Sequence, residues 1–154
     1  MAKKIGSWLL VALWASVIFY ASSQPYEKQD MKPVWEENLP TEWIDENAAF
    51  IEVPYAGEWV SVAEDGAAAV IEFFVRKAAH LGTYFILAVL LYNATRNPAV
   101  SWVLAVLYAM SDEYHQSLTP NRSPHWEDVV IDAVGALLGV LLCTMIIKRR
   151  KKRR

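Results

Sequence analysis

The sequence predicts an all-α integral membrane protein, a bundle of four transmembrane helices with both chain ends in the cytoplasm. At 154 residues the chain has room for one domain, residues 1–154, and not for two. Its apolar residues gather in four blocks: Ile5–Ala21, Ala78–Tyr92, Pro98–Met110 and Val129–Ile147. Its charged residues are segregated as well: basic residues gather beyond one end of these blocks and acidic residues beyond the other.

The first helix is expected at about residues 5–21. It follows Lys3 and Lys4, so a signal peptide is the alternative to a membrane helix. The apolar stretch is longer than a usual signal core, and Ala21-Ser22-Ser23 is a weak cleavage site. We therefore interpret this segment as an uncleaved first transmembrane helix.

The segment of about residues 22–66 is expected to be an extracytoplasmic loop. Turn-forming residues interrupt it at Pro25, Pro33, Pro40, Pro54 and Gly57. It also holds Trp35, Trp43 and Trp59, a residue type that favours the membrane interface. A loop of this length without structure of its own is usually functional or disordered. We expect short interfacial helices, which either serve a function or simply lie on lipid headgroups.

The second and third helices are expected at about residues 67–95 and 99–117. The pair Asp65-Gly66 marks a cap before the second helix. The run Arg96-Asn97-Pro98 then forms a tight turn between the two helices, because asparagine and proline both favour turns. This turn is expected on the cytoplasmic side of the membrane.

The fourth helix is expected at about residues 126–147, after an outer turn with the turn formers Pro120, Asn121 and Pro124. A basic tail, residues 148–154, ends the chain. Such a run can also be a nucleic-acid or localisation patch. Directly after an apolar helix it is better explained as an anchor to anionic headgroups, so we expect no nucleic-acid partner.

The charge distribution predicts the orientation. Ten of the 15 lysines and arginines fall in three places: Lys3–Lys4, Arg96 and Lys148–Arg154. Basic residues favour the cytoplasmic side, so an even number of crossings puts both termini inside. The segment Ser23–Ala69 carries 11 acidic residues against Lys28 and Lys32, a local charge of −9. The acidic residues then lie outside, or at the outer boundary of the membrane.

Two of the four apolar blocks are too short to cross the bilayer alone. The 13 residues from Pro98 to Met110 cover about 20 Å of a roughly 30 Å hydrocarbon core. The third helix crosses only if the polar run Ser111–Gln116 enters the outer part of the membrane with it. The same count along the second helix places Arg76 and Lys77 at the outer boundary.

Helical periodicity brings the polar side chains at this depth together. The second helix carries four of them on one face, the third helix carries three in one sector, and the fourth carries two in a narrow stripe. With one arginine from the outer turn they form the predicted site: Arg76, Lys77, His80, Tyr84, Asp112, Glu113, Gln116, Arg122, Asp128 and Asp132. Three cations thus face four carboxylates, with His80 and Gln116 between them.

Two interpretations of this site stay open. Charges at membrane depth cost a few kcal/mol each, so they pair, face the bundle interior and by default mark a functional site. Buried ion pairs can instead clamp helices without doing chemistry. His115 and His125 are expected to be interfacial polar residues outside the site. No tight ligand spacing predicts a metal, we expect no cofactor, and the single Cys143 excludes an intrachain disulfide.

Gly135 and Gly139 form a GxxxG motif on the same stripe of the fourth helix as Asp128 and Asp132. Small residues at this spacing let another backbone approach closely. The approaching helix belongs either to the same bundle or to a second copy of the chain. A homo-oligomer through Gly135 and Gly139 is therefore one of the two expectations.

Several of these motifs occur together in a fixed order. They are Ile18–Pro25, Arg76–Tyr84, Ser111–Gln116, Pro120-Asn121-Arg122, Asp128 and Asp132–Gly135. As a set covering almost the whole chain, they resemble the VanZ-like family of bacterial membrane proteins. The resemblance implies a multi-pass protein of the bacterial cytoplasmic membrane, by analogy with members linked to low-level teicoplanin resistance. The positions it carries over are Lys77, His80, Tyr84, Asp112, Glu113, Gln116, Arg122 and Asp128. Family members commonly carry Asn where this chain has Asp132, which adds a charge here.

The first functional hypothesis is a cell-envelope protein that recognises a lipid headgroup or a lipid-linked cell-wall precursor. Arg76, Lys77 and Arg122 would contact phosphate, for which guanidinium geometry is well suited. The carboxylates would orient these cations or bind sugar hydroxyls, and Tyr84 and Gln116 would complete the binding site. Tolerance to a glycopeptide antibiotic would follow from a change in what the surface exposes.

The second hypothesis is an enzyme that modifies such a lipid. Glu113 or Asp112 would be the general base, His80 an acid or base, and Arg122 would stabilise developing charge. The sequence has no nucleophile elbow, HExxH motif or P-loop to support it. A transporter is disfavoured because the inner half of the bundle is apolar. A structural partner protein clamped by its ion pairs stays open.

Overall fold

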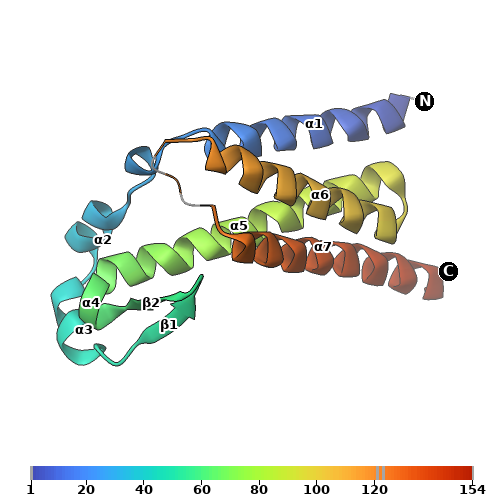
Figure 1. The fold of residues 1–154 in the computed structure, drawn as a ribbon. Coiled ribbons are helices and arrows are strands. Elements are labelled where there is room, and N and C mark those ends of the chain that lie inside the picture. The colour runs from blue at the N-terminus through green and yellow to red at the C-terminus, as the bar shows by residue number, and fades with distance from the viewer. Residues whose placement is uncertain (1, 121, 123, 154) are drawn as a thin grey trace. The chain divides into compact units, whose positions relative to one another are not determined.

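Helices make up most of the chain in the computed structural model, which describes residues 2–120, 122 and 124–153 (Figure 1). The contacts divide the chain into two units. Unit 1 comprises Met1–Pro25 and Ala79–Arg154, and unit 2 comprises Tyr26–Ala78. The sequence had suggested one domain with a long outer loop. The loop forms a unit because it has its own apolar centre, built by Val62, Ala67 and Val70.

Unit 1 contains three complete helices and the C-terminal part of a fourth. These are α1 (Ala2–Ser22), α6 (Pro98–Ser117), α7 (Trp126–Lys152) and α5 (Ala67–Thr95), which begins in unit 2. α7 continues past the expected end at residue 147 through most of the basic tail. Lysine and arginine are good helix formers, and no glycine or proline follows Ile147 to stop the helix. Of the residues discussed above, Asn121 and Arg154 lie outside the described part of the chain.

Within the described residues, three helices are long and apolar enough to cross a membrane. They are Lys4–Ser22, Ala67–Thr95 and Trp126–Arg150. α6 has 20 residues, which corresponds to about 30 Å of helix. Its last turns are the polar run Ser111–Gln116, so its composition is less apolar than that of the other three. The fourth crossing therefore stays a prediction.

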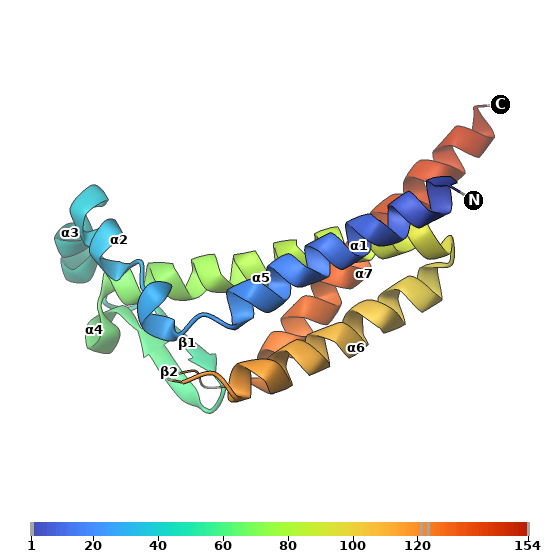
Figure 2. The same cartoon turned by 90° about the horizontal axis from the view of Figure 1, so that it is seen from above.

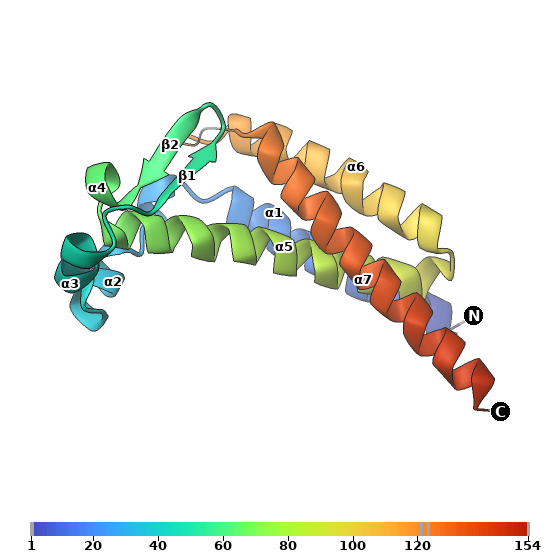
Figure 3. The same cartoon turned by 90° about the horizontal axis from the view of Figure 1, so that it is seen from below.

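The helices of unit 1 pack along one another around a core of small and aliphatic residues. This core includes Leu87, Ala88, Leu91, Ala105, Ala109, Ala136 and Val140. α1 is held by two side-chain bonds: the Trp14 indole donates to the Thr83 carbonyl at 3.0 Å, and the Tyr108 hydroxyl donates to the Ala15 carbonyl at 2.6 Å. Both chain ends lie at the same end of this unit as the α5–α6 turn (Figures 2 and 3).

The GxxxG stripe of α7 packs against α5 within the same chain. A β-carbon at Gly135 would collide with the backbone carbonyl of Leu81, and one at Gly139 would collide with that of Phe85. The two glycines therefore permit a close helix crossing, as small residues do in membrane helix pairs. Internal packing is thus one use of the motif, and self-association through Gly135 and Gly139 stays a prediction.

Unit 2 is more varied than the expected set of short interfacial helices. It contains η1 (Tyr26–Lys28), α2 (Lys32–Asn38), α3 (Thr41–Asn47), β1 (Glu52–Tyr55), β2 (Glu58–Ser61), α4 (Val62–Asp65) and the start of α5. β1 and β2 pair as an antiparallel hairpin, with Tyr55 opposite Glu58. Ala56 and Gly57 join them with φ angles of 53° and 83°, the combination of positive angles that two-residue hairpin turns require. The all-α prediction missed this hairpin.

Side-chain hydrogen bonds cap the start of α4 and the start of α5. The Ser61 hydroxyl accepts from the Glu64 amide at 3.1 Å, and the Asp65 carboxylate accepts from the Ser61 amide at 2.9 Å. Both bonds start α4, and Gly66, at φ 84°, ends it. The amide of Ala67, the first residue of α5, donates to Asp45 at 2.6 Å. The carboxylate that caps the long helix is therefore Asp45, whereas the sequence had pointed to Asp65.

Candidate functional site

Four carboxylates are buried together in unit 1, and we call them, with the polar side chains around them, the acidic cluster. The cluster consists of Asp112, Glu113, Asp128, Asp132, His80, Tyr84, Gln116 and Arg122. They come from α5, α6, α7 and the turn before α7. Electrostatic interactions connect Glu113 with Asp128 and His80, and connect Asp132 with Asp112. The cluster therefore brings together eight of the ten residues of the predicted site.

The carboxylates are almost entirely withdrawn from solvent. The exposed fraction is 5% for Asp112, 7% for Glu113, 6% for Asp128 and 2% for Asp132. Carboxylates at this depth are rare in proteins unless other groups compensate their charge. The neighbours of each one therefore decide what the cluster can do.

His80 pairs with Asp132 across the gap between α5 and α7. The Nδ1 atom of His80 lies 3.1 Å from Oδ1 of Asp132, and the imidazole keeps 19% of its side-chain surface exposed. An aspartate at one ring nitrogen fixes the orientation of a histidine and leaves the other nitrogen for a second partner. This pair is the part of the cluster best suited to proton transfer.

Gln116 connects three parts of the site. Its amide nitrogen donates to Asp112 at 3.1 Å and to the Ser22 hydroxyl at 3.4 Å. Its amide oxygen accepts from Nη2 of Arg122 at 2.8 Å. Arg122 also donates to the Gln24 carbonyl at 3.5 Å. Gln116 thereby fixes the guanidinium, the only permanently cationic group among the eight cluster residues.

Glu113 holds the junction between the outer turn and α7. Its carboxylate accepts from the backbone amide of His125, the residue that precedes α7. The bond uses one carboxylate oxygen and a neutral donor, so it orients Glu113 without neutralising its charge. His125 was expected in the turn, and its backbone amide contacts the cluster.

Tyr84 is the least satisfied member of the cluster. Its side chain is 1% exposed, and its hydroxyl makes no well-formed hydrogen bond within the described residues, although the Asp112 carboxylate acts on it as an acceptor. The carboxylates that act on it electrostatically are those of Asp112 and Asp132. A buried hydroxyl without a partner costs about 1–3 kcal/mol.

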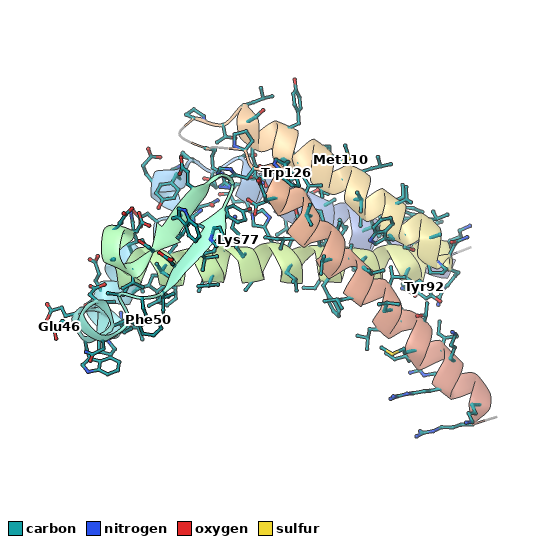
Figure 4. All side chains as sticks on the ribbon, turned by 60° about the horizontal axis from the view of Figure 1, so that its bottom comes forward. Glu46, Phe50, Lys77, Tyr92, Met110 and Trp126 are labelled. Atoms are coloured by element: carbon teal, nitrogen blue, oxygen red, sulfur yellow. The ribbon has the colours of Figure 1, made fainter. Side chains whose placement is uncertain are left out.

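The other two predicted residues, Arg76 and Lys77, belong to unit 2 and have partners there. Arg76 donates through Nε to Glu72 at 2.9 Å and through Nη2 to the Gln29 carbonyl at 3.0 Å. Lys77 lies over the Tyr55 ring with its Nζ 4.0 Å from the centroid, beside the hairpin (Figure 4). The carboxylate that pairs with Arg76 within unit 2 is Glu72, an acid that the predicted site did not include.

Glu72 is a buried, hydrogen-bonded carboxylate that the sequence analysis did not identify. It is 4% exposed and accepts from the Tyr26 hydroxyl at 3.1 Å and the Met31 amide at 2.9 Å, besides Arg76. Its spacing from Arg76 gave a usable signal, since a glutamate four residues before an arginine is a standard helical ion pair. His115 stays outside the cluster, as expected, and stacks on Phe19 with ring centroids 4.2 Å apart.

The arrangement favours some chemistries over others. Within the described residues, no three His, Cys, Asp or Glu side chains are placed to hold a metal ion. Carboxylates accept hydrogen bonds, so the cluster suits a ligand that donates them, such as one with hydroxyl or ammonium groups. Arg122 adds one donor for an anionic group of the same ligand.

Comparison with known proteins gives one result. A family model described as VanZ/LLP1 matches residues 7–148, nearly the full length of the chain. No curated protein and no solved structure matches. The family resemblance inferred from the ordered motifs is therefore confirmed, and the match includes every residue of the acidic cluster.

Proposed function

Since this chain belongs to the VanZ/LLP1 family, we propose that it is a multi-pass protein of the bacterial cytoplasmic membrane. In this proposal its acidic cluster recognises a lipid headgroup or a lipid-linked cell-wall precursor at the outer surface. Tolerance to glycopeptides such as teicoplanin would be the cellular consequence, because a bound or altered precursor changes what the antibiotic meets. The observation that carries the proposal is the burial of four carboxylates from α6 and α7, with the buried Tyr84 side chain beside Asp112 and Asp132.

The topology of the proposal has four crossings and both termini in the cytoplasm. α6 supplies the fourth crossing, because its 20 residues reach across about 30 Å. The two chain ends and the α5–α6 turn lie at one end of unit 1 (Figure 1), and ten of the 15 lysines and arginines belong to these segments. Such a bias favours the cytoplasmic side. The cluster lies toward the opposite ends of α6 and α7, which become the outer ends.

The roles within the site differ from those expected from the sequence. Arg122 is the cation that the cluster itself offers to a phosphate, and Gln116 orients it at 2.8 Å. Arg76 takes part in the Glu72 network of unit 2, so we no longer assign it to ligand binding. The carboxylates and Tyr84 would bind the donor groups of the ligand.

Glycopeptide susceptibility tests the proposal. A bacterial host without its own homologue would express wild type or Glu113→Gln at matched membrane abundance. We expect wild type to raise the tolerated teicoplanin concentration and Glu113→Gln to lose most of this effect. Glu58→Gln, at an exposed position of β2, is the control and should behave as wild type. Equal tolerance for wild type and Glu113→Gln would contradict a role for the cluster.

A second candidate function is an enzyme that modifies the same lipid, and the His80–Asp132 pair favours it. A histidine oriented by a carboxylate and partly exposed can act as a general base or acid, with Glu113 or Asp112 as its counterpart. Lipid extracts from cells that express wild type, His80→Gln or no protein would decide. A modified lipid found only with wild type would support an enzyme, and identical extracts would leave recognition without reaction.

A further inference from the structure

We propose that a pocket of unit 2 binds a neutral sugar. The pocket has a volume of about 610 Å³ and is lined by residues of α2, α3 and the first turn of α5. Small-molecule sites commonly have volumes of about 300–1,000 Å³. We call it the unit 2 pocket, and its polar and aromatic lining includes Glu36, Thr41, Glu42, Trp43, Asp45 and Asp65. The inference goes beyond the proposed function, because it concerns unit 2 and not the acidic cluster.

A buried hydroxyl without a hydrogen bond lines the pocket. Thr41 is the first residue of α3 and is 8% exposed. Its backbone amide donates to the Leu39 carbonyl at 2.8 Å, but its hydroxyl makes no hydrogen bond within the described residues. Burying a hydroxyl is costly unless it is hydrogen-bonded. Its place on the lining of the pocket therefore points to a bound ligand as its partner.

The start of α5 adds two backbone donors to the pocket. The first N–H groups of a helix have no acceptor within the helix itself. The Ala67 amide is bonded to Asp45 at 2.6 Å, whereas the amides of Ala68 and Ala69 make no hydrogen bond within the described residues. Ala68 is 6% exposed, and both residues line the pocket. A ligand there meets two amide donors in addition to the Thr41 hydroxyl.

Carboxylates supply the acceptors, and their charge disfavours an anionic ligand. Glu36 and Glu42 make no hydrogen bond or ion pair within the described residues. With Asp45 and Asp65 they place four negative charges on the lining, against the ammonium of Lys32, so an anion is repelled. A simple cation would use the carboxylates but would leave the two amides without an acceptor. Each hydroxyl of a sugar both donates and accepts, so a neutral sugar uses both kinds of group.

Trp43 supplies an aromatic surface. It is 62% exposed although it lines the pocket. A flat apolar ring can cover the C–H face of a sugar while the hydroxyls bond to polar groups around it. Trp59, in β2, is 59% exposed and does not line the pocket. The two tryptophans are therefore a matched pair for separating a role in the pocket from a general role of exposed aromatic side chains.

The test is a ligand-observed NMR titration of the full chain in a detergent without a sugar headgroup. The neutral probes are methyl glucoside and di-N-acetylchitobiose. Methyl glucuronide is the matched anion, and spermidine is the cation. We expect a neutral probe to bind, and the glucuronide to bind at least about tenfold more weakly than that probe. Binding of neither neutral probe, or tighter binding of spermidine than of both, overturns the inference.

Substitutions then assign the sugar to the pocket. We expect Trp43→Ala to weaken sugar binding about tenfold or more, and Thr41→Val to weaken it about fivefold, as for one lost hydrogen bond. Trp59→Ala should bind as wild type does. Thr41→Val keeps the test decisive if Trp43→Ala lowers the melting temperature. Unchanged affinity in Thr41→Val and Trp43→Ala, or an equal loss in Trp43→Ala and Trp59→Ala, overturns the assignment.

A further arm of the titration distinguishes a free sugar from the sugar part of a lipid. Its probe is di-N-acetylchitobiose joined to a polyprenyl diphosphate. Tighter binding of this probe than of the free disaccharide, weakened by Trp43→Ala, supports a lipid-linked sugar as the ligand of the pocket. Equal binding of the two supports a free sugar. Failure of every sugar probe overturns the pocket alone, because the susceptibility of Glu113→Gln tests the proposed function separately.

Discussion

Glu72 in unit 2 and the acidic cluster in unit 1 are two ways of burying carboxylates in the same chain. Glu72 is 4% exposed and receives bonds from the Arg76 guanidinium, the Tyr26 hydroxyl and the Met31 amide. One buried carboxylate thus has one cation and two further donors. In the cluster, four carboxylates from two helices are buried together: Asp132 pairs with His80, Asp112 accepts from Gln116, and Glu113 accepts from the His125 amide.

The difference separates structure from function. A buried charge whose bonds are complete stabilises one arrangement and leaves nothing for a ligand. Several carboxylates buried together are costly, and ionisable groups gathered between membrane helices by default mark a functional site. We therefore expect Glu72 and Arg76 to act as a structural clamp, and we propose the cluster as the functional site.

The largest expected effect concerns the close packing of α7 on α5 in unit 1, at Gly135. Gly135→Ala would drive a methyl group into the Leu81 carbonyl. We expect a loss of about 3 kcal/mol, at the upper end for overpacking. Thermal unfolding in detergent measures it. Gly82→Ala is the matched control, because a methyl group there meets nothing within 4 Å, and it should gain up to about 1 kcal/mol in helix propensity. Equal melting temperatures for the two variants would contradict the packing of α7 on α5.

The second prediction removes the ion pair between Glu72 and Arg76 in unit 2. Glu72→Gln leaves Arg76 without its carboxylate, and Arg76 keeps 27% of its side chain exposed. Because water partly solvates the guanidinium, we expect a loss of about 2 kcal/mol, below the full cost of breaking a buried pair. The melting temperature should fall, with glycopeptide tolerance reduced only in proportion to the folded protein. Selective loss of tolerance at normal stability would instead place Glu72 in the functional site.

The third prediction concerns Tyr84 in the cluster. Tyr84→Phe removes a buried hydroxyl that makes no well-formed hydrogen bond within the described residues and acts on a carboxylate, Asp112, so it should change the free energy of unfolding by less than about 1 kcal/mol. Tyr108→Phe should lower it by about 1 kcal/mol, because a made hydrogen bond is lost. Denaturation of the two variants side by side gives the sign of each change. A marked loss in Tyr84→Phe would show that the hydroxyl is bonded.

The smallest expected effect is a pH dependence in unit 2. A backbone hydrogen bond from the Lys32 amide, at 3.0 Å, is the main cause that lowers the pKa of Asp30 below its ordinary value of 3.8. A lowered pKa in the folded state means that the stabilisation is complete above pH 3.8 and is lost as the pH falls through the folded-state value. Asp30→Asn should therefore flatten the acid limb of a plot of melting temperature against pH. An unchanged limb would assign acid unfolding to other carboxylates.

Hydrophobic patterning was enough to predict the long helices, and helical periodicity was enough to predict which polar side chains of α6 share a sector. The prediction for α5 was 67–95, and the helix spans Ala67–Thr95. The need to carry Ser111–Gln116 into the membrane led to the expectation that Asp112, Glu113 and Gln116 share a sector, and all three are buried. These features depend on periodicity along a single helix, which the sequence contains in full.

Features that depend on which partner a side chain or segment contacts in the folded chain could not be predicted in the same way. The face shared by Arg76 and His80 suggested one site, but Arg76 selects Glu72, its neighbour on the same helix, over the acids of other helices. The hairpin was missed because β1 and β2 have four residues each, too few for a clear alternation beside three tryptophans that favoured interfacial helices. The turn Ala56-Gly57 was the one local signal for it.

The measurement that tests the central claim most directly is the melting temperature of Glu113→Gln beside that of Glu72→Gln, with glycopeptide tolerance measured on the same variants. The two substitutions are chemically identical, and the amide oxygen of glutamine can still accept from the His125 amide in the cluster. We predict that Glu113→Gln keeps or raises the melting temperature and loses tolerance, while Glu72→Gln lowers the melting temperature. If Glu113→Gln unfolds at a lower temperature than Glu72→Gln and both lose tolerance only with the folded protein, the acidic cluster is a helix clamp and the account is wrong.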